Sequence, residues 1–161
     1  MGGEAAYLDK AIGRYSHEVA GTARAALKKL RALFPGAGQI VYERRQSLVI
    51  GFGPAERGMP VFSLVLYPRW VRFFFFEGVA IDDPERRLEG TGNQVRSVRL
   101  DGLAEILDDA YVRGLMKQAL KLAGTDLKKG PGEVALKATL DDVTTSAAAR
   151  GRGRRVRRQA L

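Results

Sequence analysis

Cysteine is absent from this 161-residue chain, and histidine occurs once, at position 17. The absence of cysteine excludes disulfide bonds, thiolate zinc sites and cysteine nucleophiles. His17 has no identifiable partners for a Ser–His–Asp triad and lies beside a predicted helix cap, so we expect it at the surface. A metal site would need carboxylates from the acidic clusters at 82–85 or 105–109, and Asp108 and Asp109 are better explained as helix caps. We therefore predict no catalytic residue, metal site or cofactor, and nothing in the sequence requires an enzyme.

Long hydrophobic runs are also absent. The aromatic run at residues 71–76 is interrupted by Arg72 and is far too short to cross a bilayer. The first ten residues carry Glu4, Asp9 and Lys10, where a secretory signal would have an apolar core. We expect a cytoplasmic protein without membrane contact.

Positive charge is concentrated at the C-terminal end. Residues 150–161 contain six arginines and no acid, and without those six the formal net charge of +9 falls to +3. Because this segment is short and highly charged, it cannot bury enough surface to offset the entropy lost on ordering, and we expect it to be disordered. It is either a solubilising end or a non-specific contact for nucleic-acid phosphates. The arginines are Arg150, Arg152, Arg154, Arg155, Arg157 and Arg158.

Apolar periodicity predicts an α+β domain. Apolar residues recur at spacings of three and four from Ser16 to Phe34, which is typical of an amphipathic helix, and a weaker helical segment precedes it at 4–14. A second helix is predicted at 110–122, capped by Asp108 or Asp109 and ended by Gly124. Five strands are predicted between the two helices, at 39–43, 47–52, 61–67, 71–77 and 95–100.

Helices that bracket a run of strands favour a five-stranded antiparallel sheet with the N- and C-terminal helices packed on one face. The predicted domain covers residues 1–124. Residues 125–161 are predicted to be a polar, basic and largely disordered tail, with at most a frayed helix at 134–149.

The third and fourth predicted strands are apolar on both faces of the sheet. Successive strand side chains point to opposite faces, so Phe73 and Phe75 share one face while Phe74 and Phe76 share the other. Two helices cover only one face, so the second face must be covered by a homodimer partner, by the segment 134–149, or by a ligand. The candidate ligand-binding residues are Tyr67, Arg69, Trp70, Phe74, Phe76 and Arg96.

A Gly-x-Gly loop, Gly90 to Gly92, is followed by Arg96 and Arg99. Such a loop can direct backbone N–H groups at an anion, with an arginine as a clamp. It precedes a strand rather than a helix, so neither a dinucleotide fingerprint nor a P-loop is present. The favoured interpretation is an ordinary loop that leads into a partly exposed strand.

Three segments in order, 66–75 (LYPRWVRFFF), 88–100 (LEGTGNQVRSVRL) and 112–115 (VRGL), resemble the YdhG-like domain family, a bacterial group largely of unknown function. The resemblance covers about residues 16–123 and implies a frataxin-like fold, with two helices on one face of an antiparallel sheet. Some members of the family look like intracellular iron chaperones. The acidic ridge that such a role needs on the first helix is replaced here by Arg24, Lys28, Lys29 and Arg31, so no iron-binding residues are transferred.

The sequence thus supports three functional hypotheses. The first is a non-enzymatic binding or accessory protein that uses the second sheet face and its Trp and Arg neighbours. The second is a nucleic-acid-associated protein that acts through the arginine tail. The third is intracellular iron handling.

Overall fold

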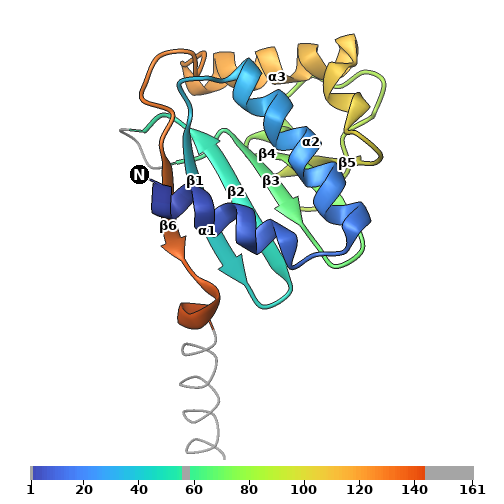
Figure 1. Cartoon of the computed structure of the whole chain (residues 1–161). Helices are drawn as coiled ribbons and strands as arrows, with labels where there is room; N and C mark the ends of the chain where they lie inside the picture. The colour runs from blue at the N-terminus through green and yellow to red at the C-terminus, as the bar shows by residue number, and fades with distance from the viewer. Residues whose placement is uncertain (1, 56–58, 144–161) are drawn as a thin grey trace, which may run out of the picture.

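The computed structural model describes residues 2–55 and 59–143, which form a mixed six-stranded sheet with three α-helices, two short 3-10 helices and helical residues at 140–143 after the last strand. Figure 1 shows the arrangement. The α-helices are α1 (Gly2–Gly13), α2 (His17–Leu33) and α3 (Ala110–Ala123), and the 3-10 helices are η1 (Gly78–Ala80) and η2 (Glu105–Asp108). The strands are β1 (Gly38–Arg44), β2 (Ser47–Gly53), β3 (Phe62–Leu66), β4 (Val71–Phe75), β5 (Arg96–Leu100) and β6 (Val134–Ala138).

The helix ends follow the predicted capping residues. The Ser16 hydroxyl accepts a hydrogen bond from the Val19 amide at 3.2 Å and so starts α2. The Asp109 carboxylate accepts from the amide of Tyr111 at 2.8 Å at the start of α3. Gly124 ends α3 with a φ of +69°, a left-handed conformation that glycine adopts without steric cost. All three boundary predictions are confirmed.

The sheet has the order β5-β4-β3-β2-β1-β6. Each of the strands β1 to β5 pairs antiparallel with the next one in the sequence, as the sequence predicts. The prediction of five strands is incomplete, because β6 adds a sixth strand parallel to β1, with Val134 opposite Gln39 and Leu136 opposite Val41.

The sixth strand corrects the predicted domain boundary. Residues 134–138, expected in a polar tail with at most a frayed helix, belong to the sheet, and the folded part therefore extends beyond residue 124. The side chains of Val134 and Leu136 are half-buried and pack against the main core. The expected disorder of residues 150–161 lies outside the described residues.

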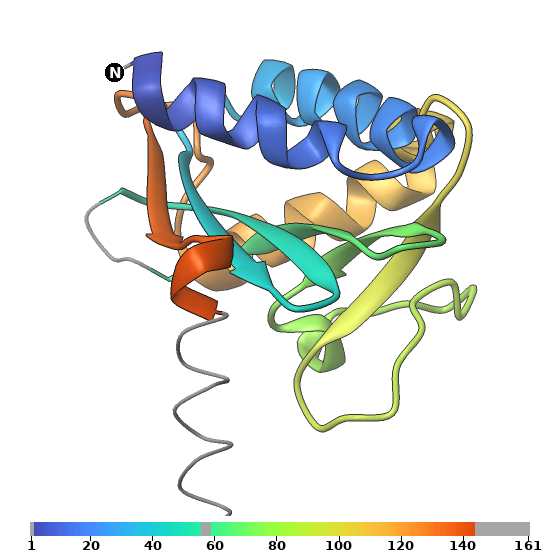
Figure 2. The ribbon, with the colours of Figure 1, turned by 60° about the horizontal axis from the view of Figure 1, so that its bottom comes forward.

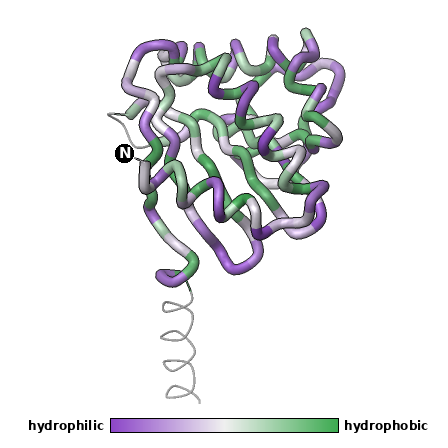
Figure 3. The backbone as a smooth tube through the Cα atoms, viewed as in Figure 1, coloured by the Kyte–Doolittle hydropathy of each residue, from purple (hydrophilic) through white to green (hydrophobic). Residues whose placement is uncertain are grey.

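The core lies between the sheet and the helical layer. Helices α1 and α2 lie side by side on one face of the sheet, and α3 runs along one end of it (Figures 1 and 2). Phe62 of β3 is fully buried beneath α2, and its ring stacks on Phe34 at 5.1 Å and on Phe73 at 5.2 Å. Figure 3 shows that the inner strands are mainly hydrophobic, whereas hydrophobic and hydrophilic residues alternate along the helices.

The long connection between β4 and β5 is fastened to α3. The Asp82 amide donates to the side-chain oxygen of Gln118 at 2.8 Å, and the Gln118 side chain donates back to the Asp82 carbonyl at 2.9 Å. The Tyr111 hydroxyl donates to Asp83, and Arg87 pairs with the carboxylate that caps α3 at 3.2 Å. These contacts hold the connection against the helix, beside the end of the sheet.

Candidate functional site: the sheet face opposite the helices

The two faces of the sheet are both apolar but differ in burial. On the helix side, Phe73 and Phe75 of β4 are completely buried. On the opposite side, Phe74 and Phe76 are only half-buried, although Val65 of the neighbouring strand is 6% exposed. The predicted alternation of the β4 rings is confirmed. The second face is therefore apolar, and the described residues cover it only in part.

A shallow groove of about 270 Å³ lies on this second face. Val49, Val65 and Phe74 form its floor, since the register of β2, β3 and β4 directs their side chains to the same side. The hydroxyls of Ser47 and Ser63 add hydrogen-bonding groups. We call this hollow the sheet-face groove, and its lining is Arg44, Ser47, Val49, Ser63, Val65, Tyr67, Phe74, Phe76 and Val95.

Arg44 supplies an available positive charge to the sheet-face groove. Its side chain is exposed and makes no hydrogen bond, ion pair or ring contact with any other residue in the ranges 2–55 and 59–143. The other two arginines of this face are engaged, because Arg72 binds the Ser97 hydroxyl and Glu89, both at 2.9 Å, and Arg99 binds Asp101 at 3.1 Å. A ligand anion in the groove would therefore meet Arg44.

Three of the residues predicted from the sequence meet in the groove: Tyr67, Phe74 and Phe76. Trp70 stands beside it in the β3–β4 turn, 42% exposed, with its ring 6.3 Å from that of Tyr67. The guanidinium of Arg99 lies 5.7 Å from the Trp70 ring centre, a cation–π contact that helps to hold the indole. Arg69 is exposed in the same turn and does not line the groove.

Arg96 is directed away from the groove. It lies opposite Phe75 in the β4–β5 register, on the helix side of the sheet. Its Nη1 donates to the carbonyls of Gly92 at 2.7 Å and Val95 at 2.8 Å, so the arginine closes its own loop. The Gly-x-Gly segment thus has the character of an ordinary loop leading into β5.

Sequence reasoning missed Arg44, although a signal for it was present. Ile40, Tyr42 and Arg44 alternate along β1 and therefore share the face that carries Phe74. Counting this alternation through to the turn would have placed a cation at the end of the groove.

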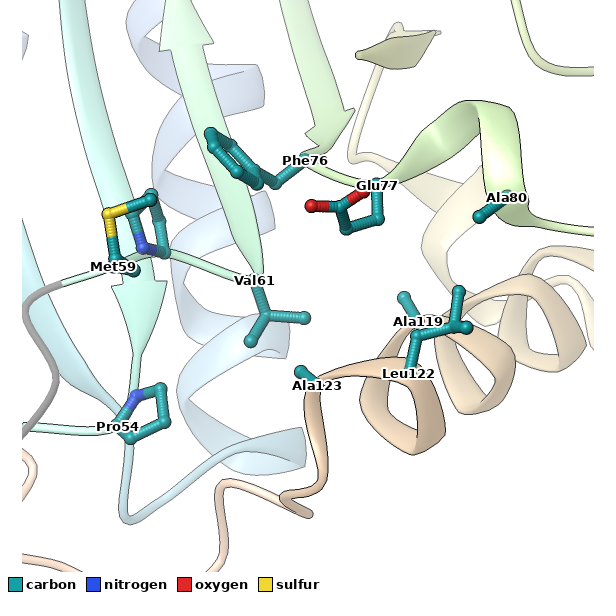
Figure 4. Close-up of a pocket in the computed structure, with 10 residues that line it drawn as sticks. Pro54, Met59, Val61, Phe76, Glu77, Ala80, Ala119, Leu122 and Ala123 are labelled. Carbon is teal, nitrogen blue, oxygen red and sulfur yellow. The ribbon is translucent and has the colours of Figure 1, made fainter. Parts of the chain in front are cut away.

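A second hollow, of about 400 Å³, lies where α3 ends near β3 and β4 (Figure 4). It is lined mainly by apolar side chains, and two of them, Met59 and Leu122, are 56% and 53% exposed. Phe76 lines both this hollow and the sheet-face groove. We call it the helix-end pocket, and its lining is Pro54, Met59, Pro60, Val61, Phe76, Glu77, Ala80, Ala119, Leu122 and Ala123.

The acidic clusters serve the fold. Asp108 pairs with Lys29 and, at 3.1 Å, with Arg113, and the hydrogen bond from Lys29 is the main cause that lowers the pKa of this carboxyl. Burial alone would raise the pKa of Asp83, but the hydrogen bonds it accepts, chiefly from the Tyr111 hydroxyl and the Leu88 amide, lower it overall. Over residues 2–55 and 59–143 no group of three or more His, Cys, Asp or Glu side chains could hold a metal ion.

The tail arginines predicted to contact nucleic acid lie outside the described residues. Among the helices that are described, none is long and apolar enough to span a membrane. Comparison with known proteins adds no relative, because no family model, curated protein or solved structure matches the chain.

Proposed function

We propose that this chain is a non-enzymatic binding protein whose ligand occupies the sheet-face groove and combines an apolar body with an anionic group. The observation that carries the proposal is the position of Arg44, an exposed arginine without a partner in the described chain, at the end of an apolar floor. The floor contributes by burying apolar ligand surface, and the guanidinium orients the ligand by a charge-assisted hydrogen bond.

The charge of this face favours an anionic ligand over the other two occupants predicted from the sequence. In a symmetric homodimer the same patch meets itself, and the described lining of the groove offers Arg44 no acidic partner from a second copy. Part of the segment 134–149 cannot cover the second face of the sheet, because residues 134–138 pair with β1 at the sheet edge. The six tail arginines would meet a face of their own charge sign.

We also propose a frataxin-like arrangement and membership of the YdhG-like family. Support comes from the antiparallel order of β1 to β5 and from the helical layer on one face of the sheet. The motif residues Tyr67 and Trp70 form the β3–β4 turn beside the groove, which gives this part of the resemblance a role in ligand binding. Iron handling gains no support, because Asp83, Asp108 and Asp109 are bound to other side chains.

The test compares two ligands of equal length and opposite charge, octanoate and octylamine, by isothermal titration calorimetry. We expect octanoate to bind more tightly, and Arg44→Ala to weaken octanoate about fivefold, the equivalent of about 1 kcal/mol for an exposed ion pair. Arg45→Ala is the matched control, since Arg45 is exposed in the turn directly after Arg44 and does not line the groove.

Three results would count against this function. The first is the absence of saturable heat with millimolar octanoate, and the second is equal affinity for the two ligands. The third is a dimer, measured by light scattering without ligand, that Phe74→Asp dissociates, because this would make a second copy the occupant of the face.

A further inference from the structure

The two hollows share a lining residue, Phe76, and we call the two together the track. Phe76 lines the sheet-face groove on one side and the helix-end pocket on the other, and Val61, beside it in the sheet, also lines the pocket. The track begins at the turn between β1 and β2 and follows β3 to its opposite end. Six residue steps separate Tyr67 from Val61, and at a rise of about 3.4 Å per residue this part of the track is about 20 Å long.

The track is electrically polarised. Arg44 lies at one end, whereas none of the described residues that line the helix-end pocket is a lysine, arginine or histidine. The pocket instead carries Glu77, and it lies at the C-terminal end of α3, where the helix dipole is negative. An anionic group is therefore favoured at the Arg44 end and disfavoured beside Leu122.

The pocket suits the apolar end of a ligand. Leu122 and Met59, each more than half exposed, line it, and Val61, Ala119 and Ala123 complete an apolar wall (Figure 4). With carbon–carbon bonds of about 1.5 Å in a zigzag, an extended chain of about sixteen carbons is about as long as the part of the track between Tyr67 and Val61.

We infer that the ligand of this protein is a single unbranched amphiphile of about sixteen carbons, with its carboxylate or phosphate head on Arg44 and its tail end in the helix-end pocket. This inference rests on the proposed function and specifies its ligand. Both ends of the track lie on the protein surface, so the amphiphile lies flat along the sheet. The protein therefore binds it as a free monomer and not as part of a lipid bilayer.

The test measures affinity against chain length. Calorimetry with octanoate and with palmitate, the latter below its aggregation concentration, compares the wild type with Leu122→Glu. Leu103→Glu is the matched control, because Leu103 is also an exposed leucine and lines neither hollow. In a groove open on one side we expect each methylene to contribute about half of its full burial free energy, which is about twofold in affinity. Over the eight methylenes that separate the two ligands, the affinity should therefore rise by more than about a hundredfold.

Leu122→Glu should weaken palmitate binding at least tenfold and leave octanoate binding within twofold, while Leu103→Glu leaves both unchanged. The inference is overturned if octanoate and palmitate bind the wild type equally, or if Leu122→Glu and Leu103→Glu have the same effect on palmitate. In either case an Arg44-dependent affinity for octanoate would still uphold the proposed function. Binding of palmitoyl-chain phospholipid vesicles without binding of free palmitate would overturn the monomer part of the inference.

Discussion

Two adjacent phenylalanines of β4 provide the sharpest test of the two-faced sheet. Phe73 is fully buried and its ring contacts those of Phe62 and Phe75, each at 5.2 Å, whereas Phe74 is half-buried on the open face. Phe73→Ala removes a core ring and leaves a cavity, which costs about 3–5 kcal/mol in the free energy of unfolding. Phe74→Ala removes a ring that keeps part of its contact with water, and we expect about 1–2 kcal/mol.

Urea denaturation followed by circular dichroism measures both costs. The residue type, the strand and the substitution are the same, so the loss of β-propensity cancels and the difference reports the face alone. A difference of about 2 kcal/mol moves the urea midpoint by about 1 M at the slope usual for a domain of this size. If Phe73→Ala fails to fold, the Leu variants at both positions should keep the same order. Equal costs at the two positions would refute the assignment of one ring to the core and the other to an open groove.

Two further predictions concern α3 and the loop fastened to it. Gly124→Ala forces an alanine to a φ of +69° and should destabilise the protein by about 1 kcal/mol. Gly114→Ala lies inside the same helix with no neighbouring atom within 4 Å of the added carbon, and it should stabilise the protein by about 0.5–1 kcal/mol. Thermal melts that show the same sign for both substitutions would contradict the cap assignment. The folded protein holds the pKa of Asp83 below its ordinary value of 3.8, so this carboxylate favours folding at neutral pH, and the benefit is lost as the pH falls below about 4 through the lowered pKa. Asp83→Asn should therefore make stability less sensitive to acid in urea titrations at several pH values, and an unchanged pH slope would show that the Tyr111 hydroxyl does not support this carboxylate in solution.

The sequence predicts the elements best where a chemical marker stands at their ends. Ser16, Asp109 and Gly124 each satisfy backbone groups that a helix end leaves open, and the structure begins or ends a helix at each of them. The aromatic strands were equally predictable, because short runs that are apolar at successive positions and bounded by turn residues are typical of strands in a sheet with two apolar faces.

The sixth strand was not predictable in the same way. Residues 134–138, Val-Ala-Leu-Lys-Ala, have low β-propensity, and the polar segment before them is typical of a tail. The strand exists because the edge of β1 offers unpaired backbone groups and because Val134 and Leu136 can reach the core. This information lies in the tertiary structure and not in the local pattern.

The candidate site was predicted in its apolar part and missed in its charged part. The ring pattern placed Phe74 and Phe76 on the second face, where the groove contains them. The choice of Arg96 as the cation depended on the direction of a long side chain, which its own loop carbonyls determine. Arg44 is the last residue of β1, and its place at the groove follows from the alternation along β1 together with the pairing of β1 with β2.

The two margins of the sheet limit how the protein can associate with copies of itself. Beyond β5, the backbone N–H and C=O of Ser97 are already bonded to Glu89, both at 2.8 Å. At the other margin, β6 is five residues long and carries Lys137, and its pairing with β1 shifts register between Val41 and Tyr42. Short, irregular and charged margins offer a poor template for a strand from another molecule. The chain can therefore keep an aromatic surface open to solvent while its sheet margins give a strand from another molecule only short stretches to pair with.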